Sequence, residues 1–278
     1  MPAVPVPQSA APHPSLYAAV AARSFRRYAT YVAATLAGIF TNSVFGVITS
    51  FVYVAVWRAN PTAGGYDVTD AVTYVWIGQA MLMTVCMFGG GSPDDLASRI
   101  RSGDVAVDLY RPVSLLGWYL AADLGRAAYH LLTRGAAPLL VGGLLFDLRW
   151  PLGWELLWFG LSLPLAVAVS FALRMLAALS AFWLLDDTGP RSLLNFLAVF
   201  GSGLTVPLVL FPDGVREVLT ALPFAAYLQL PADLWLGQRT GVDALAALGL
   251  AAGWAVVLLT ACAWVLRAAE RRVVVQGG

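Results

Sequence analysis

Long segments without any charged side chain restrict this chain more than any other feature of its sequence. The chain contains no Lys, and six segments also lack Arg, Asp and Glu: 28–57, 71–93, 135–146, 156–173, 192–212 and 244–266. A helix needs about 20 residues to cross the hydrocarbon core of a bilayer. Four segments reach that length and 156–173 nearly does. Segment 135–146 is long enough if its helix starts near Ala127, so that Arg134 lies within the span.

These segments predict an all-α integral membrane protein. Hydrophobic residues make up 59% of the chain and charged residues 12%, whereas a typical soluble domain has about 25% charged residues. We expect one transmembrane domain over residues 15–272, with six transmembrane helices at about 30–57, 70–91, 126–146, 156–183, 192–211 and 243–266.

The residue composition also excludes several functions. All 17 basic residues are Arg, so the chain has neither the lysine of a phosphate-binding loop nor a Schiff-base lysine. It is not expected to hydrolyse ATP by itself, and no catalytic residue or cofactor is predicted. The two Cys and two His lie far apart in the sequence, which argues against a metal site. A net charge of +1 argues against a nucleic-acid partner.

The two ends of the chain differ from the rest. Five prolines within residues 1–14 predict a disordered tail, and 273–278 form a short C-terminal tail. Ser15 is placed to cap a helix that lies along the membrane surface. Its apolar face is Leu16, Tyr17, Val20, Ala21, Phe25 and Tyr28, and its polar face is Arg23, Arg26 and Arg27. Alternatively, this segment is the basic start of the first span. The apolar run 28–57 is too long for a signal peptide.

The distribution of arginines predicts the orientation. With the N-terminus in the cytoplasm, twelve arginines fall on cytoplasmic segments and four outside, as positive charge favours. Both termini are then cytoplasmic in a multi-pass protein. The cytoplasmic arginines are Arg23, Arg26, Arg27, Arg99, Arg101, Arg111, Arg126, Arg134, Arg191, Arg267, Arg271 and Arg272; Arg58, Arg149, Arg216 and Arg239 lie outside, and Arg174 is left unassigned.

A strongly charged loop separates the second and third spans. Its sequence predicts one helix from Ser92, as the N-cap, to Ser102-Gly103, and a second from Asp104 to Tyr110. Arg111-Pro112 ends the second helix, and Ser114 is placed to cap the next. Two short helices with a few apolar side chains among charges are typical of a docking surface. The alternative is a loop that is polar only because it is in water.

The same loop carries a resemblance. The run IRSGDVAVDLYRPVSLLGWYLAADLGRA, 100–127, resembles the loop of bacterial ABC-2-type transporter permeases, with Gly103-Asp104, then DLYRP, then DLGR. A second run, FPDGVREVLTALPFAAYLQLPADLWLG at 211–237, is similar to the family's connection between spans five and six. Three prolines and a turn at Asp213-Gly214 independently predict short helices there that re-enter the membrane.

The resemblance implies a permease subunit of an exporter in the inner, cytoplasmic membrane. A separate ABC ATPase subunit drives it, and a second permease copy or a homologous permease completes the pathway. The loop between spans two and three then supplies the ATPase-coupling helix. The residues assigned to coupling are Asp104, Val105, Asp108, Leu109 and Arg111. An apolar lining favours an amphipathic or lipid-like cargo, so membrane lipid is a further expected partner.

A polar face is predicted on span three. Asp123, Arg126, His130 and Arg134 are spaced by three, four and four residues, which places them on one side of a helix. Charges at this depth usually face protein or water, so substrate entry or contact with the surface helix is one interpretation. The other is that the arginines extend to the lipid headgroups.

Two other functions stay open. Asp104 and Asp108 have the spacing with which Mg²⁺-dependent membrane transferases present carboxylates, although the second acidic cluster of such enzymes is missing. An ion-coupled secondary transporter is the third hypothesis, but its buried carboxylates are missing from the charge-free segments. No protease motif of the GxSxG, HExxH or GxGD type occurs.

Overall fold

A computed structural model describes residues 14–184 and 186–271. The C-terminal tail at 273–278 and the N-terminal tail, except for its last residue, lie outside the described residues. Within the described ranges every regular element is helical. The elements are α1 (Pro14–Ala29), α2 (Val32–Ala59), η1 (Ala63–Gly65), α3 (Val68–Thr84), α4 (Ser92–Ser102), α5 (Val105–Leu109), α6 (Leu115–His130), η2 (Leu131–Gly135), α7 (Ala136–Leu145), α8 (Trp154–Leu179), α9 (Ala181–Leu184), α10 (Thr188–Gly201), η3 (Leu208–Leu210), α11 (Asp213–Ala221), η4 (Pro223–Tyr227), α12 (Gln229–Trp235) and α13 (Gly241–Glu270).

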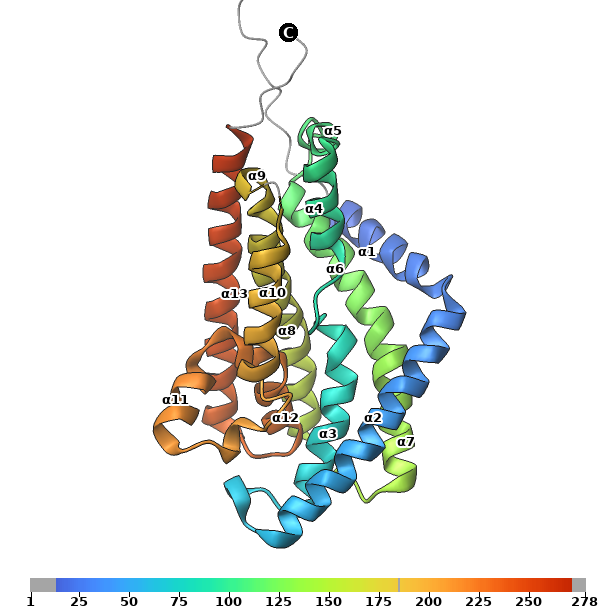
Figure 1. Cartoon of the computed structure of the whole chain (residues 1–278), viewed down its shortest axis with the longest axis vertical. Helices are drawn as coiled ribbons and strands as arrows, with labels where there is room; N and C mark the ends of the chain where they lie inside the picture. Colours follow the sequence, from blue (N-terminus) through green and yellow to red (C-terminus); the bar gives the residue numbers. More distant parts are fainter. Residues whose placement is uncertain (1–13, 185, 272–278) are drawn as a thin grey trace, which may run out of the picture.

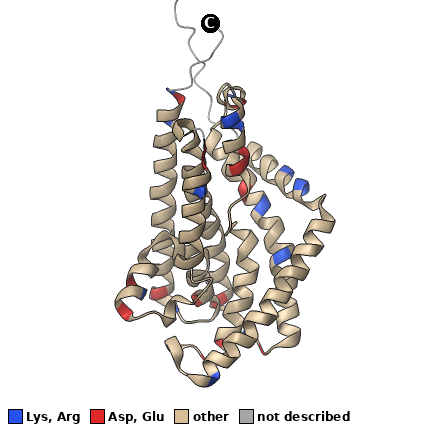
Figure 2. Cartoon of the chain, viewed as in Figure 1, with Lys and Arg blue, Asp and Glu red and all other residues tan. Residues whose placement is uncertain are grey.

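The helices form an elongated bundle with two distinct ends (Figure 1). One end carries α4, α5, α9 and the last turns of α13, and we call it the α5 end. The other carries α11, α12 and the connection between α2 and α3, and we call it the α12 end. Charged side chains gather mainly at these two ends (Figure 2). This distribution suits a protein whose middle lies in hydrocarbon.

Three helical segments are long and apolar enough to cross a membrane: Val32–Ala59, Trp154–Leu184 and Gly241–Glu270. They coincide with the first, fourth and sixth predicted spans. Two of the other predicted spans, the second and the fifth, are interrupted. Helix α3 ends at Thr84, and α10 ends at Gly201 before the turn η3. The third predicted span is continuous and longer than expected, because α6, the π-helical η2 and α7 follow one another without a break from Leu115 to Leu145. The six-span count stays a prediction.

The helix breaks between α3 and α4, and α4 then continues toward the α5 end (Figure 1). Gly89, Gly90 and Gly91 all have positive φ, as has Cys86, and such backbone conformations are easily reached by glycine. Gly91, not Ser92, is the N-cap of α4. The predicted Ser92 cap is wrong because the Ser92 hydroxyl instead donates a hydrogen bond to the carbonyl of Tyr119, at 2.7 Å.

The predicted ends of the α4–α5 hairpin (residues 92–109) are largely confirmed. Gly103 ends α4 with a left-handed backbone, and the Ser114 hydroxyl accepts a hydrogen bond from the amide of Gly117 at the start of α6. Asp104 occupies the N-cap position of α5 but makes no capping bond. Its carboxylate accepts from the Ser102 hydroxyl at 2.8 Å.

Glycines allow the helices around α3 and α6 to approach closely. A Cβ on Gly125 of α6 would lie 2.0 Å from the carbonyl oxygen of Ala21 in α1. The fully buried Trp76 of α3 packs against Gly46 of α2 and Gly142 of α7. Small residues at helix contacts are typical of membrane bundles. The predicted N-terminal helix is thus present and packs on α6, with its arginines exposed.

The segment between α10 and α13 contains the short helices that the prolines predict. Helix α12 and the 3-10 helix η4 are buried and pack against α8, whereas α11 has no buried residue. These elements fold back against the α12 end of the bundle (Figure 1). Re-entry into a membrane stays a prediction.

The contact between α1 and α6 can be tested at Gly125. Replacing Gly by Ala within a helix normally stabilises it by about 1 kcal/mol. In Gly125→Ala the added methyl group collides with the α1 backbone, and we expect a loss of about 1–3 kcal/mol instead. The thermal midpoint of the purified protein in detergent measures this. Gly249→Ala in α13, where a Cβ meets nothing within 4 Å, is the matched control. Equal midpoints for the two variants would contradict the contact.

Candidate functional site: the ion network beneath the α4–α5 hairpin

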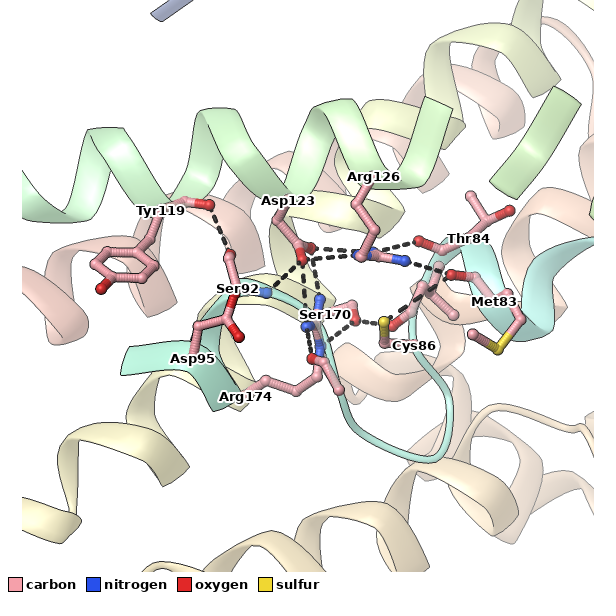
Figure 3. A network of polar contacts seen from close by, with 12 residues as sticks. Met83, Thr84, Cys86, Ser92, Asp95, Tyr119, Asp123, Arg126, Ser170 and Arg174 are labelled. Carbon is pink, nitrogen blue, oxygen red and sulfur yellow. Dashed lines mark hydrogen bonds and ion pairs between the residues drawn. The ribbon is translucent and has the colours of Figure 1, made fainter. Parts of the chain in front are cut away.

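A buried carboxylate lies at the centre of the α5 half of the bundle. Asp123 of α6 is 0% exposed and forms ion pairs with Arg126, at 2.9 Å, and with Arg174 of α8, at 2.7 Å. Figure 3 shows both guanidinium groups directed at the Asp123 oxygens. A buried charge is tolerated only when it is paired and its remaining hydrogen-bonding groups have partners. The network meets this condition with two cations for one anion.

The remaining donors of the two arginines bind backbone carbonyls where α3 ends. Arg126 donates to the carbonyl oxygens of Met83 and Thr84, and Arg174 donates to that of Gly90 at 2.7 Å. Carbonyls in the last turn of a helix lack helical partners, and positive charge is favourable there. The network thus completes the end of α3 inside the bundle (Figure 3).

The start of α4 is tied to the same carboxylate. The backbone amide of Ser92 donates to Asp123 at 3.4 Å. A Cβ on Gly91 would lie 2.6 Å from the Asp123 Oδ1 atom and 2.9 Å from Arg174 Nη1. Residue 91 must therefore be glycine for two reasons, its positive φ and the lack of space. We call Asp123, Arg126 and Arg174 the Asp123 network.

A second ionic contact holds α5 against α4 and α6. Asp108 is buried and pairs with Arg99 of α4 and, at 3.3 Å, with Arg111. The Tyr119 hydroxyl donates to Asp108 at 3.4 Å, and burial raises the pKa of Tyr119. Hydrogen bonding to Asp108 raises the pKa of Arg99. Helix α5 is too short to be stable alone, so these contacts fix its orientation.

Helix α4 is held on two sides by further ion pairs. Asp94 pairs with Arg191 of α10 at 3.0 Å, and Arg101 pairs with Asp187, which precedes α10. On the opposite side Asp95 pairs with Arg27 of α1 at 3.0 Å. The hairpin is therefore connected to α1, α6 and α10, and it moves only together with them or by breaking these contacts.

The five residues predicted to couple to an ATPase do not share one face. Asp104 and Arg111 are exposed, Leu109 packs partly on the core, and Val105 and Asp108 are buried. Two other side chains of the hairpin, which no sequence pattern singles out, point outward. They are Val107, 59% exposed, and Tyr110, 76% exposed. Direct contact with a partner would fall first on these two residues, while Asp108 positions the helix.

The four residues predicted to form a polar face divide into two groups. Asp123 and Arg126 belong to the Asp123 network. His130 instead lies against the rings of Tyr28, at 5.1 Å, and Tyr129, at 5.4 Å. The Arg134 guanidinium lies against Gly38 of α2, where a Cβ would come within 2.1 Å of its Nε atom. Among the described residues, neither His130 Nδ1 nor Arg134 Nε has a hydrogen-bond partner.

Two parts of the molecule were missed by the sequence analysis. Arg174, left unassigned, is the second cation of the Asp123 network. At the α12 end, the buried Asp233 accepts hydrogen bonds from Tyr66 and Gln229 and pairs with Arg239 at 3.2 Å. Burial raises the pKa of Asp233. The sequence did indicate a role for Arg174, because it is the lone charged residue of an apolar predicted span. Nothing in the sequence pairs Asp233 with Tyr66.

A cavity of about 340 Å³ opens between α2 and α3. No charged residue lines it. Its polar groups come from Thr41, Asn42, Thr49 and Tyr53 of α2 and from Tyr74 and Gln79 of α3, and the rest of its wall is apolar. The wall includes Phe88, in the loop that leads to the Asp123 network. The cavity therefore suits an uncharged molecule with few hydrogen-bonding groups.

The comparison with known families agrees with this architecture. Three apolar helices of membrane-spanning length, among described regular elements that are all helical, indicate a membrane protein. The sequence model of the family described as ABC-2 family transporter protein matches residues 44–277, which is most of the chain. The chain belongs to the ABC-2 transporter family, whose members are permease components of ABC transporters and generally work with an ABC ATPase. A search of curated proteins found no match.

The Asp123 network can be tested by removing its anion. Asp123→Asn leaves two buried guanidinium groups without a counter-charge, so we expect a loss of about 3–5 kcal/mol. Thermal unfolding in detergent, together with the monodisperse fraction on size exclusion, measures this. Asp213→Asn is the control, because Asp213 also pairs with an arginine but is 83% exposed. If both variants unfold at the same temperature, the network does not hold the helices together.

Proposed function

We propose that this chain is the transmembrane permease subunit of an ATP-driven exporter. Two copies, or one copy and a homologous permease, form the translocation pathway in the bacterial inner membrane. A separate ABC ATPase subunit binds the α5 end, which faces the cytoplasm together with both termini. The permease itself is not catalytic.

The observation that carries the proposal is the construction of the α4–α5 hairpin. It projects from the bundle (Figure 1), and ion pairs of the buried Asp108 with Arg99 and Arg111 fix its orientation. It presents Val107 and Tyr110 outward. An exposed tyrosine on a rigid support, surrounded by charge, matches the composition of protein–protein hot spots. A loop that only needed to stay in water would not require this support.

The contacts also supply a route for force. Displacement of α5 acts on α4 through Arg99, and α4 begins at Gly91 and Ser92, beside Asp123. Asp123 connects α6 with α8, and Arg126 connects α6 with the end of α3. Helix α3 forms one wall of the 340 Å³ cavity. A movement imposed by an ATPase would therefore reach the proposed pathway through three consecutive polar contacts.

The cavity supports a neutral amphipathic cargo. It lies between α2 and α3, and a row of exposed apolar residues continues along α2 beyond it: Leu36, Phe40, Val44, Phe45, Ile48, Phe51, Val52 and Val56. Such a face is covered either by lipid or by a partner permease. A second copy that packs on α2 would enclose the cavity and complete the pathway.

The two alternative functions receive less support. Both oxygens of Asp108 are engaged, Oδ1 by Arg111 and Oδ2 by Arg99, so Mg²⁺ binding by Asp104 and Asp108 would require breaking two ion pairs. Asp123, which is 0% exposed, is held between two guanidinium groups. Coupling to an ion gradient requires a carboxylate that readily gains and loses a cation.

Substitution of Tyr110 tests the docking surface. Tyr110→Asp and Val107→Asp place a charge on the outward face, and we expect at least about tenfold weaker binding of the ATPase. Both residues are exposed, so the permease should still fold. Leu109→Asp is less informative, because Leu109 packs on the core. The ABC ATPase that co-purifies with the wild-type chain is quantified for each variant.

The matched control is Ala268→Asp, which adds the same charge to an exposed position near the end of α13, also at the α5 end. Equal ATPase recovery from all variants would contradict docking at α5. A wild-type chain that transports its cargo with no ATPase bound would contradict the proposed function itself.

Because Cys86 and Cys262 are buried, a photo-crosslinker on Tyr110→Cys provides an independent readout, and the adduct with the ATPase should form there.

A further inference from the structure

A crevice of about 620 Å³ lies between α1, α4 and the start of α6. We propose that it binds the phosphate group of an anionic phospholipid. Four arginines and two aspartates line it, which leaves two positive charges in excess: Arg23, Arg27, Arg99, Arg111, Asp95 and Asp108. The site is separate from the cavity between α2 and α3, and lipid binding there does not depend on what the chain transports.

The ion pairs within the crevice show which arginines are available to a ligand. Arg27 pairs with Asp95, and Arg99 and Arg111 share the single carboxylate of Asp108. Arg23 has no acidic partner among residues 14–184 and 186–271. Arg23 and one of the two arginines at Asp108 therefore carry uncompensated charge. Guanidinium groups bind phosphate oxygens through two parallel hydrogen bonds.

The walls of the crevice favour a lipid as the source of the phosphate. Val20 of α1 and Ala122 of α6 line it, together with Trp118 and Tyr119. The Arg111 guanidinium lies over the Trp118 ring, 5.7 Å from its centroid. Aromatic and basic residues together are typical of the level of lipid headgroups. A soluble phosphate compound would use the arginines but gain little from this apolar wall.

A bound headgroup would connect α1 with the hairpin. In the protein alone, one ion pair, between Arg27 and the exposed Asp95, crosses from α1 to α4, and exposed pairs contribute little. A phosphate between Arg23 on α1 and Arg111 after α5 would add a second connection. Anionic lipid would thereby hold α1 against the α4–α5 hairpin.

The test compares two arginines on the same helix. Arg23 lines the crevice, whereas Arg26 does not, and both are exposed on α1. Full-length wild type, Arg23→Gln and Arg26→Gln are titrated in detergent with phosphatidylglycerol and with phosphatidylcholine, and native mass spectrometry counts the bound lipids. We expect wild type to prefer phosphatidylglycerol, about tenfold weaker binding in Arg23→Gln, and unchanged binding in Arg26→Gln.

Two results would overturn the site. Equal weakening in both variants would mean that the helix attracts lipid by diffuse charge only. Equal binding of phosphatidylcholine would remove the anionic specificity. Competition with glycerol 3-phosphate separates the two sources of phosphate. If phosphatidylglycerol stays bound in the presence of glycerol 3-phosphate, the lipid site is supported. If glycerol 3-phosphate displaces it at a concentration comparable to that of the lipid, a lipid is not the occupant. Thermal midpoints of the three proteins, measured without lipid, should agree and so exclude misfolding.

Discussion

The pairing of Asp123 with two arginines is the interaction on which the arrangement of the bundle depends. A carboxylate without any exposed surface is tolerated only because two guanidinium groups reach it from two different helices. Their remaining donors bind carbonyls at the end of α3 and in the following loop. One anion therefore fixes α6, α8 and α3 relative to one another. It also allows a helix to end inside the bundle, where its last carbonyls would otherwise lack partners.

The network explains why the apolar segment 71–93 is not a single straight helix. Its composition would permit a continuous span, yet α3 ends at Thr84 and the chain reaches α4 through a loop with three glycines of positive φ. The two arginines bind carbonyls that the break in the helix exposes, and the lack of a side chain on Gly91 leaves room for Asp123. Backbone irregularity at such a depth is tolerated where it is buried within protein. Helix α4 can then lie against α6 and carry α5 beyond the bundle.

Sequence reasoning succeeded where local composition alone decides the structure. Length and lack of charge suffice for α2, α8 and α13, and Gly103 and Ser114 set helix ends through bonds to near neighbours. It failed where partners are distant in the chain. Arg174 meets Asp123 across 51 residues, and no spacing rule connects them. The inward turn of Asp108 was missed because a helix as short as α5 has too few residues to show a periodicity, so contacts with Arg99 and Tyr119 decide which side is buried.

The loop from Phe88 to Ser92 brings three features of the molecule together. Phe88 lines the cavity between α2 and α3, and Ser92 lines the basic crevice. Between them, Gly90 and Gly91 contact Arg174 and Asp123. The loop is short and both of its ends are hydrogen-bonded, at Phe88 to Asn195 and at Ser92 to Tyr119, so we expect it to pass a displacement of α4 on to its neighbours. Any event that shifts α4, whether at the hairpin or in the crevice, must therefore move a wall of the cavity or break the Asp123 network. Breaking the network is the costlier outcome, since it leaves buried charge unpaired.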